Sequence, residues 1–346
     1  MDKPGEVYVQ TNDAAGNQVI AYGRAGDGTP SLRGRYDTGG LGTGEPHLAS
    51  QGSVTLTDDG RWLLVVNAGS NDVSVLTVGA GGLDLAGRAS SGEAPISVAA
   101  HEGYVYVLNS GGESGKGSIS GFAMGMDGTL EPLPGSTRPL SQAGADPAQV
   151  AFSPDGTTLV VTEKATNGIS LYPVGENGVA EGPVAQPSSG VTPYGFGFTR
   201  RGTLVVTEAF GARAGAAAVS SYALVAPSRL APISTSVGNT RTAVCWAVIS
   251  KDDRFAFVTN FGDGTVSSYR IAGEGSIELH DPVAATTVPG EKGIRDVALT
   301  SDGRHLYAIH ADMGRLYAFQ VSEDGRLVAL GMAGGLPATV AGLAAS

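Results

Sequence analysis

What this sequence lacks excludes several classes of protein. Its 346 residues include 22 Lys and Arg against 33 Asp and Glu, which gives a formal net charge of -11. No run of basic residues supplies the clustered positive charge that a phosphate backbone requires, so we expect no nucleic-acid partner. The one cysteine, Cys245, cannot form an internal disulfide, which favours a reducing compartment. We expect its thiol to be buried and inert.

Long apolar runs and helical patterns are also missing. No stretch approaches the roughly 20 apolar residues that a membrane helix needs. The start of the chain, MDKPGEVYVQ, has neither the basic region nor the apolar region of a secretory signal. We therefore expect a cytoplasmic protein with no membrane contact. No segment keeps the 3.6-residue apolar period of an amphipathic helix, so folds with helices between their strands are excluded.

Glycine is abundant, with 53 residues, and a pattern of short apolar strands recurs along the chain. Each copy has an apolar strand, a polar turn ending in Asp-Gly or similar, a Val-rich strand, a Gly/Asn/Ser loop and a third strand. The six visible copies begin at Ser53, Ser97, Gln149, Gly195, Trp246 and Asp296. Their turns are about 43 to 53 residues apart, which is typical of four-stranded propeller blades.

The two ends of the chain supply a seventh unit. The segment GEVYVQTNDAAGNQVIAYGRAGDGTPSLRGRY, from Gly5, holds a second, third and fourth strand, and the C-terminal LPATVAGLAAS could supply the missing first strand. A ring closed in this way has no exposed sheet edge. We predict an all-β fold, one seven-bladed β-propeller domain over residues 1–346, with its first blade closed by the C-terminal strand. Since such a ring needs no partner to cover its edges, we expect a monomer.

Chain direction in a propeller brings the starts of the inner strands and the ends of the second strands to one face, around the mouth of the central channel. Binding residues commonly lie on such loops. From the inner-strand starts we expect contacts to a small-molecule substrate by Gln149, Tyr194, Trp246, Arg295 and Asp296. Polar residues end the second strands: Asn67, Asn109, Glu163, Glu208, Asn260 and His310, with Thr11 or Asn12 from the first blade.

Glu163 and Glu208 stand in matching contexts, VVTEKA and VVTEAF, on successive blades. We expect their side chains to approach the same part of the pocket, where repulsion between two carboxylates raises one pKa and suits acid-base catalysis. The alternative is that each caps loop amides or pairs with a cation. Motifs for zinc, phosphate and calcium sites are absent, and we expect no cofactor. A divalent cation held by Glu163, Glu208 and Asn260 stays open.

The remaining candidates each carry two interpretations. Arg295 suits an anionic group of a ligand, or an ion pair between blades. His310 suits a base near neutral pH, or a hydrogen-bonded structural side chain. Trp246 and Tyr194 suit an apolar pocket wall, or packing between blades. His47 lies in the connection to the second blade and could reach the rim of the pocket. Asn67, Asn109 and Asn260 would line the same mouth.

The segments FSPDGTTLVVTEKATNGISLYPV and ISKDDRFAFVTNFGDGTVSSYRI carry a family resemblance. In these strands the chain resembles the seven-bladed propeller lactonases, which include the propeller-type 6-phosphogluconolactonases and the 3-carboxymuconate cyclases. The resemblance implies a lactonase-like enzyme acting on a small cyclic ester, and Glu163 and Glu208 match the family's Glu after the second strand. We expect Glu163 or Glu208 to activate water or move a proton, with His310 assisting. Where the family has an Arg-His pair, this chain has Arg295 and Asp296. The alternatives are a non-catalytic scaffold that binds a small molecule or protein, and a cyclase, isomerase or lyase that uses the same pocket.

Overall fold

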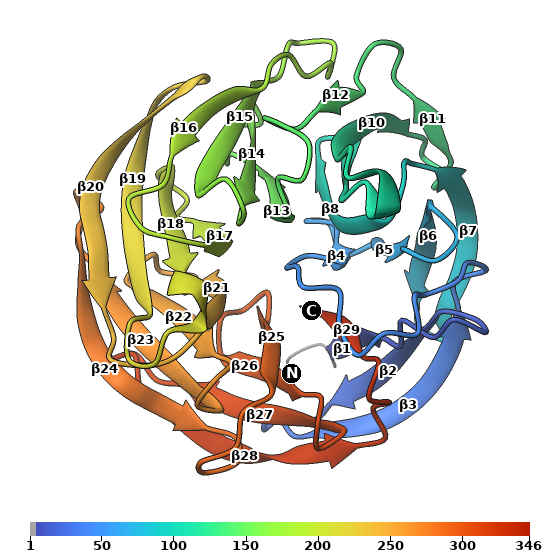
Figure 1. Ribbon diagram of the computed structural model, residues 1–346. Coiled ribbons are helices and arrows are strands. Elements are labelled where there is room, and N and C mark those ends of the chain that lie inside the picture. The colour runs from blue at the N-terminus through green and yellow to red at the C-terminus, as the bar shows by residue number, and fades with distance from the viewer. Residues whose placement is uncertain (1–4) are drawn as a thin grey trace.

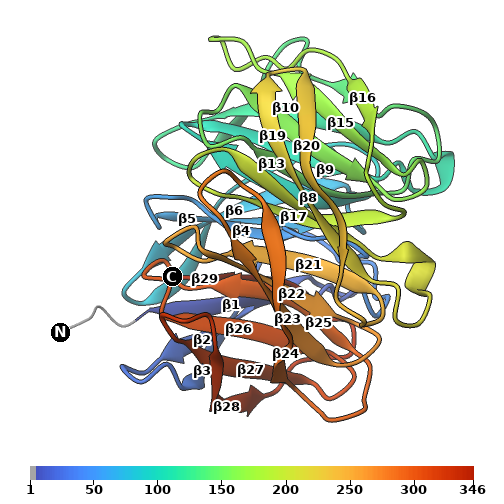
Figure 2. The ribbon, with the colours of Figure 1, turned by 90° about the vertical axis from the view of Figure 1, so that its left-hand side faces the viewer.

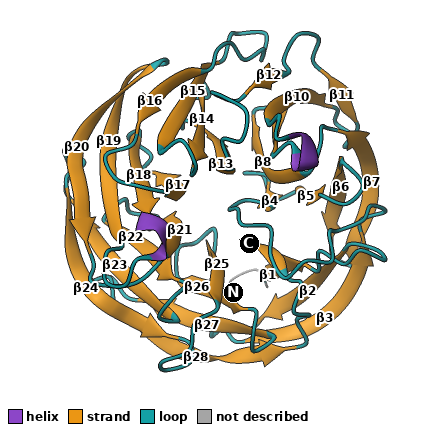
Figure 3. Ribbon diagram, in the orientation of Figure 1, coloured by secondary structure: helices purple, strands orange, loops and turns teal. Residues whose placement is uncertain are grey.

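Short Val-rich strands joined by tight turns form seven antiparallel sheets in this chain. The computed structural model describes residues 5–346, and the sheets surround a central axis as the blades of a closed ring (Figure 1). The predicted all-β, seven-bladed propeller is confirmed. Figure 3 shows two short helices on this frame, the 3₁₀ helices Gly112–Ser114 and Phe210–Ala212.

The blades are numbered along the chain, and each is given from its inner strand to its outer strand. Blade 1 is β29 (Ala341–Ala345), β1 (Glu6–Gln10), β2 (Gln18–Arg24) and β3 (Pro30–Asp37). Blade 2 is β4 (Val54–Leu56), β5 (Trp62–Asn67), β6 (Asp72–Gly79) and β7 (Gly82–Ser90). Blade 3 is β8 (Pro95–His101), β9 (Tyr104–Asn109), β10 (Ser118–Met124) and β11 (Leu130–Pro132), and β12 (Arg138–Pro139) also pairs with β10.

Blades 4 to 7 repeat this order. Blade 4 is β13 (Pro147–Phe152), β14 (Thr158–Glu163), β15 (Gly168–Pro173) and β16 (Val184–Pro187). Blade 5 is β17 (Pro193–Phe198), β18 (Thr203–Glu208), β19 (Ala218–Ala226) and β20 (Arg229–Gly238). Blade 6 is β21 (Val244–Ile249), β22 (Phe255–Asn260), β23 (Thr265–Ile271) and β24 (Ile277–Thr286). Blade 7 is β25 (Ile294–Leu299), β26 (His305–His310), β27 (Arg315–Val321) and β28 (Leu327–Gly334).

The C-terminal strand closes the ring, as predicted. β29 is antiparallel to β1, with Val7 opposite Ala345 and Tyr8 opposite Ala344. The backbone N–H of Ser346 donates to the carbonyl of Glu6 at 2.9 Å. The side view places β29 next to β1 as well (Figure 2). Because the last strand pairs with the first, neither end of the sheet series is left with an open inner edge.

The core lies between neighbouring blades, because the second strands are buried on both faces. In β5, Leu63 and Val65 pack toward blade 1, whereas Leu64 and Val66 pack toward blade 3. All four side chains are fully buried, and each contributes about 1.5–3 kcal/mol by leaving water. Packing of this kind fixes every blade against the next, so residues at matching positions of the repeat fall at matching heights along the axis.

The turn between the first and second strands sets the chain direction in each blade. In blade 4, Asp155 Oδ1 accepts hydrogen bonds from Ser153 Oγ at 2.6 Å and from the Thr157 N–H at 3.2 Å. Gly156 follows with a φ of 70°, a left-handed conformation that glycine adopts without strain. These turns share one face of the ring, and the starts of the inner strands therefore share the opposite face.

Of the helices in residues 5–346, none has the length and apolar character needed to span a membrane.

Candidate functional site

The polar residue that ends each second strand lies inside its blade. In five blades this side chain is fully buried and is hydrogen-bonded to a serine at the third position of the following strand. We call these the serine-paired positions: Asn67 with Ser74, Asn109 with Ser120, Glu163 with Ser170, Glu208 with Ser220 and Asn260 with Ser267. Most of them also hold the connection that arrives from the previous blade.

Glu163 shows how complete this pairing is. Its carboxylate accepts hydrogen bonds from Ser170 Oγ at 2.7 Å, from Thr166 Oγ1 at 3.0 Å and from the Ser141 N–H at 3.1 Å. The Ser141 hydroxyl donates to the same group. Both carboxylate oxygens are therefore used by donors of the protein itself.

Glu208 is enclosed in the same way within blade 5. It accepts hydrogen bonds from Ser220 Oγ at 2.5 Å, Ser236 Oγ at 2.7 Å and the Gly190 N–H at 2.8 Å. The structure therefore does not bring Glu163 and Glu208 together at the mouth of the channel, since each faces its own set of donors.

Glu163, Glu208 and Asn260, the residues considered as ligands of a divalent cation, also face separate sets of hydrogen-bond partners. Asn260 Oδ1 accepts from Asn239 Nδ2 at 2.9 Å, and Asn239 lies in the connection from blade 5 to blade 6. Across residues 5–346, no group of three or more His, Cys, Asp and Glu side chains is arranged to hold a metal ion.

Blades 7 and 1 break the serine pairing. His310 ends β26 at the same position, but Tyr317 stands where the serine would be, with its ring centroid 6.4 Å from the imidazole. His310 is fully buried, and neither ring nitrogen has a hydrogen-bond partner among the described residues. In blade 1, Gln10 ends β1 and is fully buried with Nε2 and Oε1 unpaired, and the hydroxyl of the next residue, Thr11, accepts from the Gln18 N–H at 2.9 Å. His310 and Gln10 thus lack the hydrogen bonds that the serine-paired side chains make.

Arg295 lies at the start of the inner strand of the same blade. It is 8% exposed, and its Nη2 is 3.6 Å from Asp312 Oδ1. Its Nε and Nη1 are buried and have no partner within residues 5–346. Burial lowers the pKa of the guanidinium, although the charge of Asp312 acts in the opposite direction. The pKa of His310 is lowered mainly by burial, and Arg295 adds to that effect, so the imidazole is neutral at pH 7.

Asp296 follows Arg295 directly in the chain, and its pKa is raised rather than lowered. Its Oδ1 accepts a hydrogen bond from the Val297 N–H at 2.9 Å, and the Leu343 N–H of blade 1 also donates to its carboxylate. Its Oδ2 is buried without a partner in the described chain. Burial raises the pKa of Asp296 to about 8, because the charged form is poorly solvated. At neutral pH this carboxyl therefore carries its proton.

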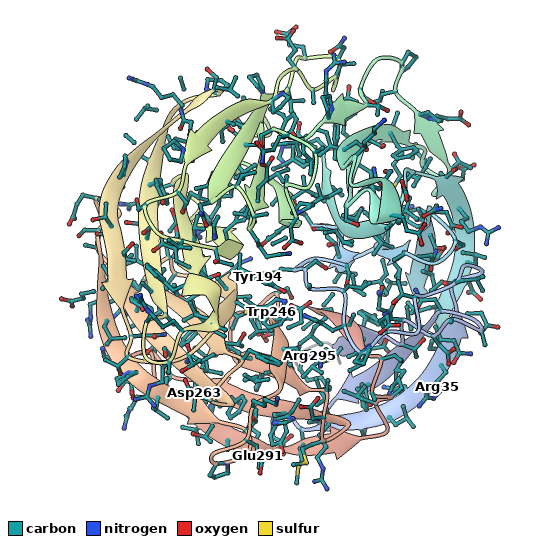
Figure 4. All side chains as sticks on the ribbon, in the orientation of Figure 1. Arg35, Tyr194, Trp246, Asp263, Glu291 and Arg295 are labelled. Atoms are coloured by element: carbon teal, nitrogen blue, oxygen red, sulfur yellow. The ribbon has the colours of Figure 1, made fainter. Side chains whose placement is uncertain are left out.

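Three aromatic rings, those of Tyr194, Trp246 and His47, lie close to one another beside these groups. Tyr194 and Trp246 have ring centroids 5.4 Å apart, and His47 lies 6.1 Å from Trp246. In Figure 4, Tyr194, Trp246 and Arg295 lie next to one another near the centre of the ring, whereas Arg35 lies at its periphery. Burial raises the pKa of Tyr194 well above its ordinary value, and its hydroxyl has no partner among residues 5–346. Both aromatic residues pack in a buried cluster that also includes Ala148 and Ile294 of other blades, and their role as a pocket wall stays a prediction.

The tautomer of His47 follows from a hydrogen bond within its own loop. Its Nδ1 accepts a hydrogen bond from the Ala49 N–H at 3.1 Å, so the proton of the neutral ring is on Nε2. Burial lowers the pKa of His47 to about 4, with further contributions from Arg295 and Lys164. Lys164 itself has no free donor, because Nζ reaches Pro147 O at 2.9 Å, Ala49 O at 3.0 Å and Asp146 Oδ1 at 3.1 Å.

Unpaired buried polar atoms are therefore concentrated in one place, which we call the Arg295 site: His47, Tyr194, Trp246, Arg295, Asp296 and His310. Six such atoms belong to it: Tyr194 Oη, Arg295 Nε and Nη1, Asp296 Oδ2, and His310 Nδ1 and Nε2. The others in residues 5–346 are dispersed over Gln10, Arg24, Ser53, Asn109, Arg241, Thr259 and Ser268. Since a buried polar group without a partner costs about 1–3 kcal/mol, this group of unpaired atoms makes the Arg295 site the candidate functional site.

Two expected residues lie elsewhere on the axis. Gln149 accepts from the Phe196 N–H at 2.7 Å and donates to the Phe196 carbonyl at 3.2 Å, which ties blade 4 to blade 5. It also lines an axial cavity of about 680 Å³, together with Asp296. This cavity runs toward the face of the Asp-Gly turns, where Asp58 and Arg200 line it. The open part of the channel is thus on the face opposite to the expected mouth.

Cys245 is buried, and its pKa is raised by burial to about 12, in agreement with an inert thiol. The serine pairing was not anticipated, although its signal is present in the sequence. The segments DVSVL, SISGF, GISLY, AVSSY and TVSSY carry the five serines, and RLYAF, which follows His310, does not.

The fold and this axial site define a seven-bladed propeller with a polar cluster where its inner strands begin. No family model matches the chain. It is 22% identical over 246 residues to a 6-phosphogluconolactonase from Yersinia pestis (strain Pestoides F), covering 68% of both proteins. The periplasmic gluconolactonase of Pseudomonas aeruginosa has a TM-score of 0.71 and 19% identity, with 98% of this chain and 99% of that chain covered. A functionally unknown protein from Desulfotomaculum acetoxidans has a TM-score of 0.74 and 13% identity, with 99% of each chain covered.

These likenesses agree with the resemblance identified from the repeated strands. The chain resembles propeller lactonases, weakly in sequence and along nearly its whole length in structure. At this level of identity the solved structures establish the fold.

Proposed function

We propose that this protein is a lactonase-like hydrolase that opens a small cyclic ester at the Arg295 site. The observation that carries the proposal is the concentration of unpaired buried polar atoms on Tyr194, Arg295, Asp296 and His310. Similarity to proteins named 6-phosphogluconolactonase and gluconolactonase supports this reaction class.

The two titratable groups of the site have pKa values displaced in opposite directions, which assigns their roles. His310 is neutral at pH 7 and can take a proton, whereas Asp296, with a pKa of about 8, can give one. His310 removes a proton from water as the water oxygen bonds to the ester carbonyl carbon. Asp296 donates the proton on Oδ2 to the ring oxygen as the carbon–oxygen bond of the ring breaks. The product is an open-chain hydroxy acid, and proton exchange with solvent restores both groups.

Donors are available for the oxygen that becomes negative during this attack. Arg295 offers Nε–H and Nη1–H, and His47 offers Nε2–H. Hydrogen bonds to a developing oxyanion in a site that excludes water are among the largest contributions to catalysis. Trp246 supplies an apolar surface for the ring of the substrate.

The number of cationic groups available in the site restricts the class of substrate that it can bind. Arg295 has unpaired N–H groups, but every donor of Lys164 is used by the protein. One cation suits a carbonyl or a single carboxylate better than a phosphate group, which commonly requires several. We therefore favour an unphosphorylated γ- or δ-lactone.

The test is turnover of purified protein against γ- and δ-lactones, including δ-gluconolactone and its 6-phosphate, measured as proton release above the uncatalysed rate. We expect hydrolysis that is lost in His310→Gln and in Asp296→Asn, with both variants folded. Full activity in both variants would overturn the assignment. No turnover by the wild-type protein on any lactone would favour the scaffold or the cyclase, isomerase and lyase alternatives.

A further inference from the structure

The segment His47–Gly52, which we call the strap, lies across the axis of the ring. In Figure 1 the blue loop before β4 reaches toward the centre. Its contacts extend to three other blades: Ser50 Oγ donates to Ile96 O at 2.7 Å, the Gln51 N–H donates to Ala148 O at 3.0 Å, and Trp246 Nε1 donates to Ser50 O at 2.8 Å. The strap thus joins blades 3, 4 and 6 beside the axial cavity, which Gln51 and Gly52 help to line.

Gln51 fastens the strap to the far side of the ring. Its Nε2 donates to Ala247 O at 2.7 Å, and its Oε1 accepts from the Ala247 N–H at 3.0 Å. Both hydrogen bonds are buried and join residues 196 positions apart. One side chain therefore satisfies the backbone of an inner strand that belongs to another blade.

Gly195 provides the room for this contact. A Cβ at Gly195 would overlap Gln51 Oε1 and approach Cys245 O to 2.6 Å. In blade 4 the matching position is Gln149, which makes the same pair of hydrogen bonds to Phe196 of the next blade. In blade 5 this position is a glycine, and Gln51 makes the equivalent bonds from the strap.

We propose that Gln51 is a positioning residue for the Arg295 site, an inference that rests on the proposed function. By fixing the strap against Ala247, Gln51 holds the His47 ring beside Trp246 and so positions its Nε2–H donor. Lys164 supports the same strap through its bond to Ala49 O.

The matched variants are Gln51→Ala and Gln149→Ala, since each removes two hydrogen bonds of the same kind from an inner strand. Cys245, the one cysteine, is buried next to Trp246, and its reaction rate with a thiol reagent reports opening of the strap. We expect Cys245 to react roughly tenfold faster in Gln51→Ala than in Gln149→Ala at similar melting temperatures. Equal labelling rates in these two variants would overturn the proposal, whether or not the protein hydrolyses lactones.

Catalysis provides the second readout. If Gln51 acts through His47, then Gln51→Ala and His47→Ala should each lower kcat about tenfold, and the double variant should lose no more than either single variant. Additive losses would contradict the positioning role. Gln51→Glu keeps the acceptor for the Ala247 N–H and loses the donor, so it should give intermediate labelling and kcat. This variant decides the matter if Gln51→Ala does not fold.

Discussion

The serine-paired positions and the Arg295 site are both polar and both buried, but they differ in hydrogen bonding. Every carboxylate oxygen of Glu163 and Glu208 accepts hydrogen bonds from nearby donors. Arg295, Asp296 and His310, in contrast, keep buried atoms without a partner among the described residues. A completely paired buried group stabilises the fold, whereas a group left unpaired is available to a ligand. Satisfaction of hydrogen bonds, rather than charge or burial, therefore distinguishes Glu163 and Glu208 from the Arg295 site, whereas Asn109 keeps one unpaired oxygen, Oδ1.

The largest effect is expected at Arg295. Replacement by Met keeps much of the side-chain volume and removes the donors for the oxyanion, so kcat/KM should fall roughly 10³-fold with little change in melting temperature. Steady-state kinetics on the best lactone measures this. Arg254→Met is the control, since Arg254 is exposed and pairs with Asp252 at 3.6 Å on the surface. A loss of kcat/KM in Arg254→Met as large as that in Arg295→Met would contradict the assigned role of Arg295.

At Glu163 the comparison predicts lost stability instead. Glu163→Ala leaves the donors of Ser141, Thr166 and Ser170 without their acceptor, and the free energy of unfolding should fall by roughly 3 kcal/mol. Denaturant unfolding measures this, and kcat per folded molecule should stay within about twofold of wild type. Glu208→Ala should show the same loss of stability and the same retained kcat. A catalytic role, as the sequence suggested, would appear as a large loss of kcat in a protein of normal stability.

The buried carboxyl of Asp296 should make the stability of the protein depend on pH. Its pKa is raised on folding, from 3.8 to about 8, so its contribution to stability is complete at acid pH and is lost as the pH rises toward 8. Asp296→Asn should remove this dependence and be more stable than wild type by roughly 2 kcal/mol at pH 9. Unfolding curves between pH 5 and about pH 9 test this sign. A wild-type protein that gains stability over this interval, relative to the variant, would contradict the buried neutral carboxyl.

The smallest predicted effect is the shape of the pH–rate profile. Activity requires neutral His310 and protonated Asp296, so kcat/KM should fall about tenfold per pH unit above a limit near 8 and again at acid pH below the ordinary histidine range. Glu208→Gln should keep both limits. If Glu208→Gln moved either pH limit of kcat/KM, the acid-base role would belong to the serine-paired positions instead.

Much of the fold was predictable because the signals are local. The strand repeats and the Asp-Gly turns fix the blades, and the unpaired segments at the two ends predict β29 beside β1. The residues of the candidate site could be named from the sequence, but their hydrogen bonding could not. Arg295, Trp246 and Tyr194 follow from their repeat positions, but pairing depends on which donors surround a side chain. Glu163 and His310 occupy the same position, and only the residue at the third position of the next strand, Ser170 or Tyr317, separates them.

The strap could not be predicted in the same way. Gln51 contacts Ala247 across the axis, and no periodic pattern connects two residues that far apart in the chain. Gly195 is the one local sign, because a glycine stands at the position where blade 4 has Gln149.

The most direct measurement is calorimetric titration of gluconate, the ring-opened product of δ-gluconolactone, into the wild-type protein, Arg295→Met and Glu208→Gln. The carboxylate of gluconate should bind the unpaired N–H groups of Arg295, so we predict binding by the wild-type protein and by Glu208→Gln with similar Kd, and no measurable binding by Arg295→Met. Retained binding in Arg295→Met together with lost binding in a folded Glu208→Gln would contradict the account.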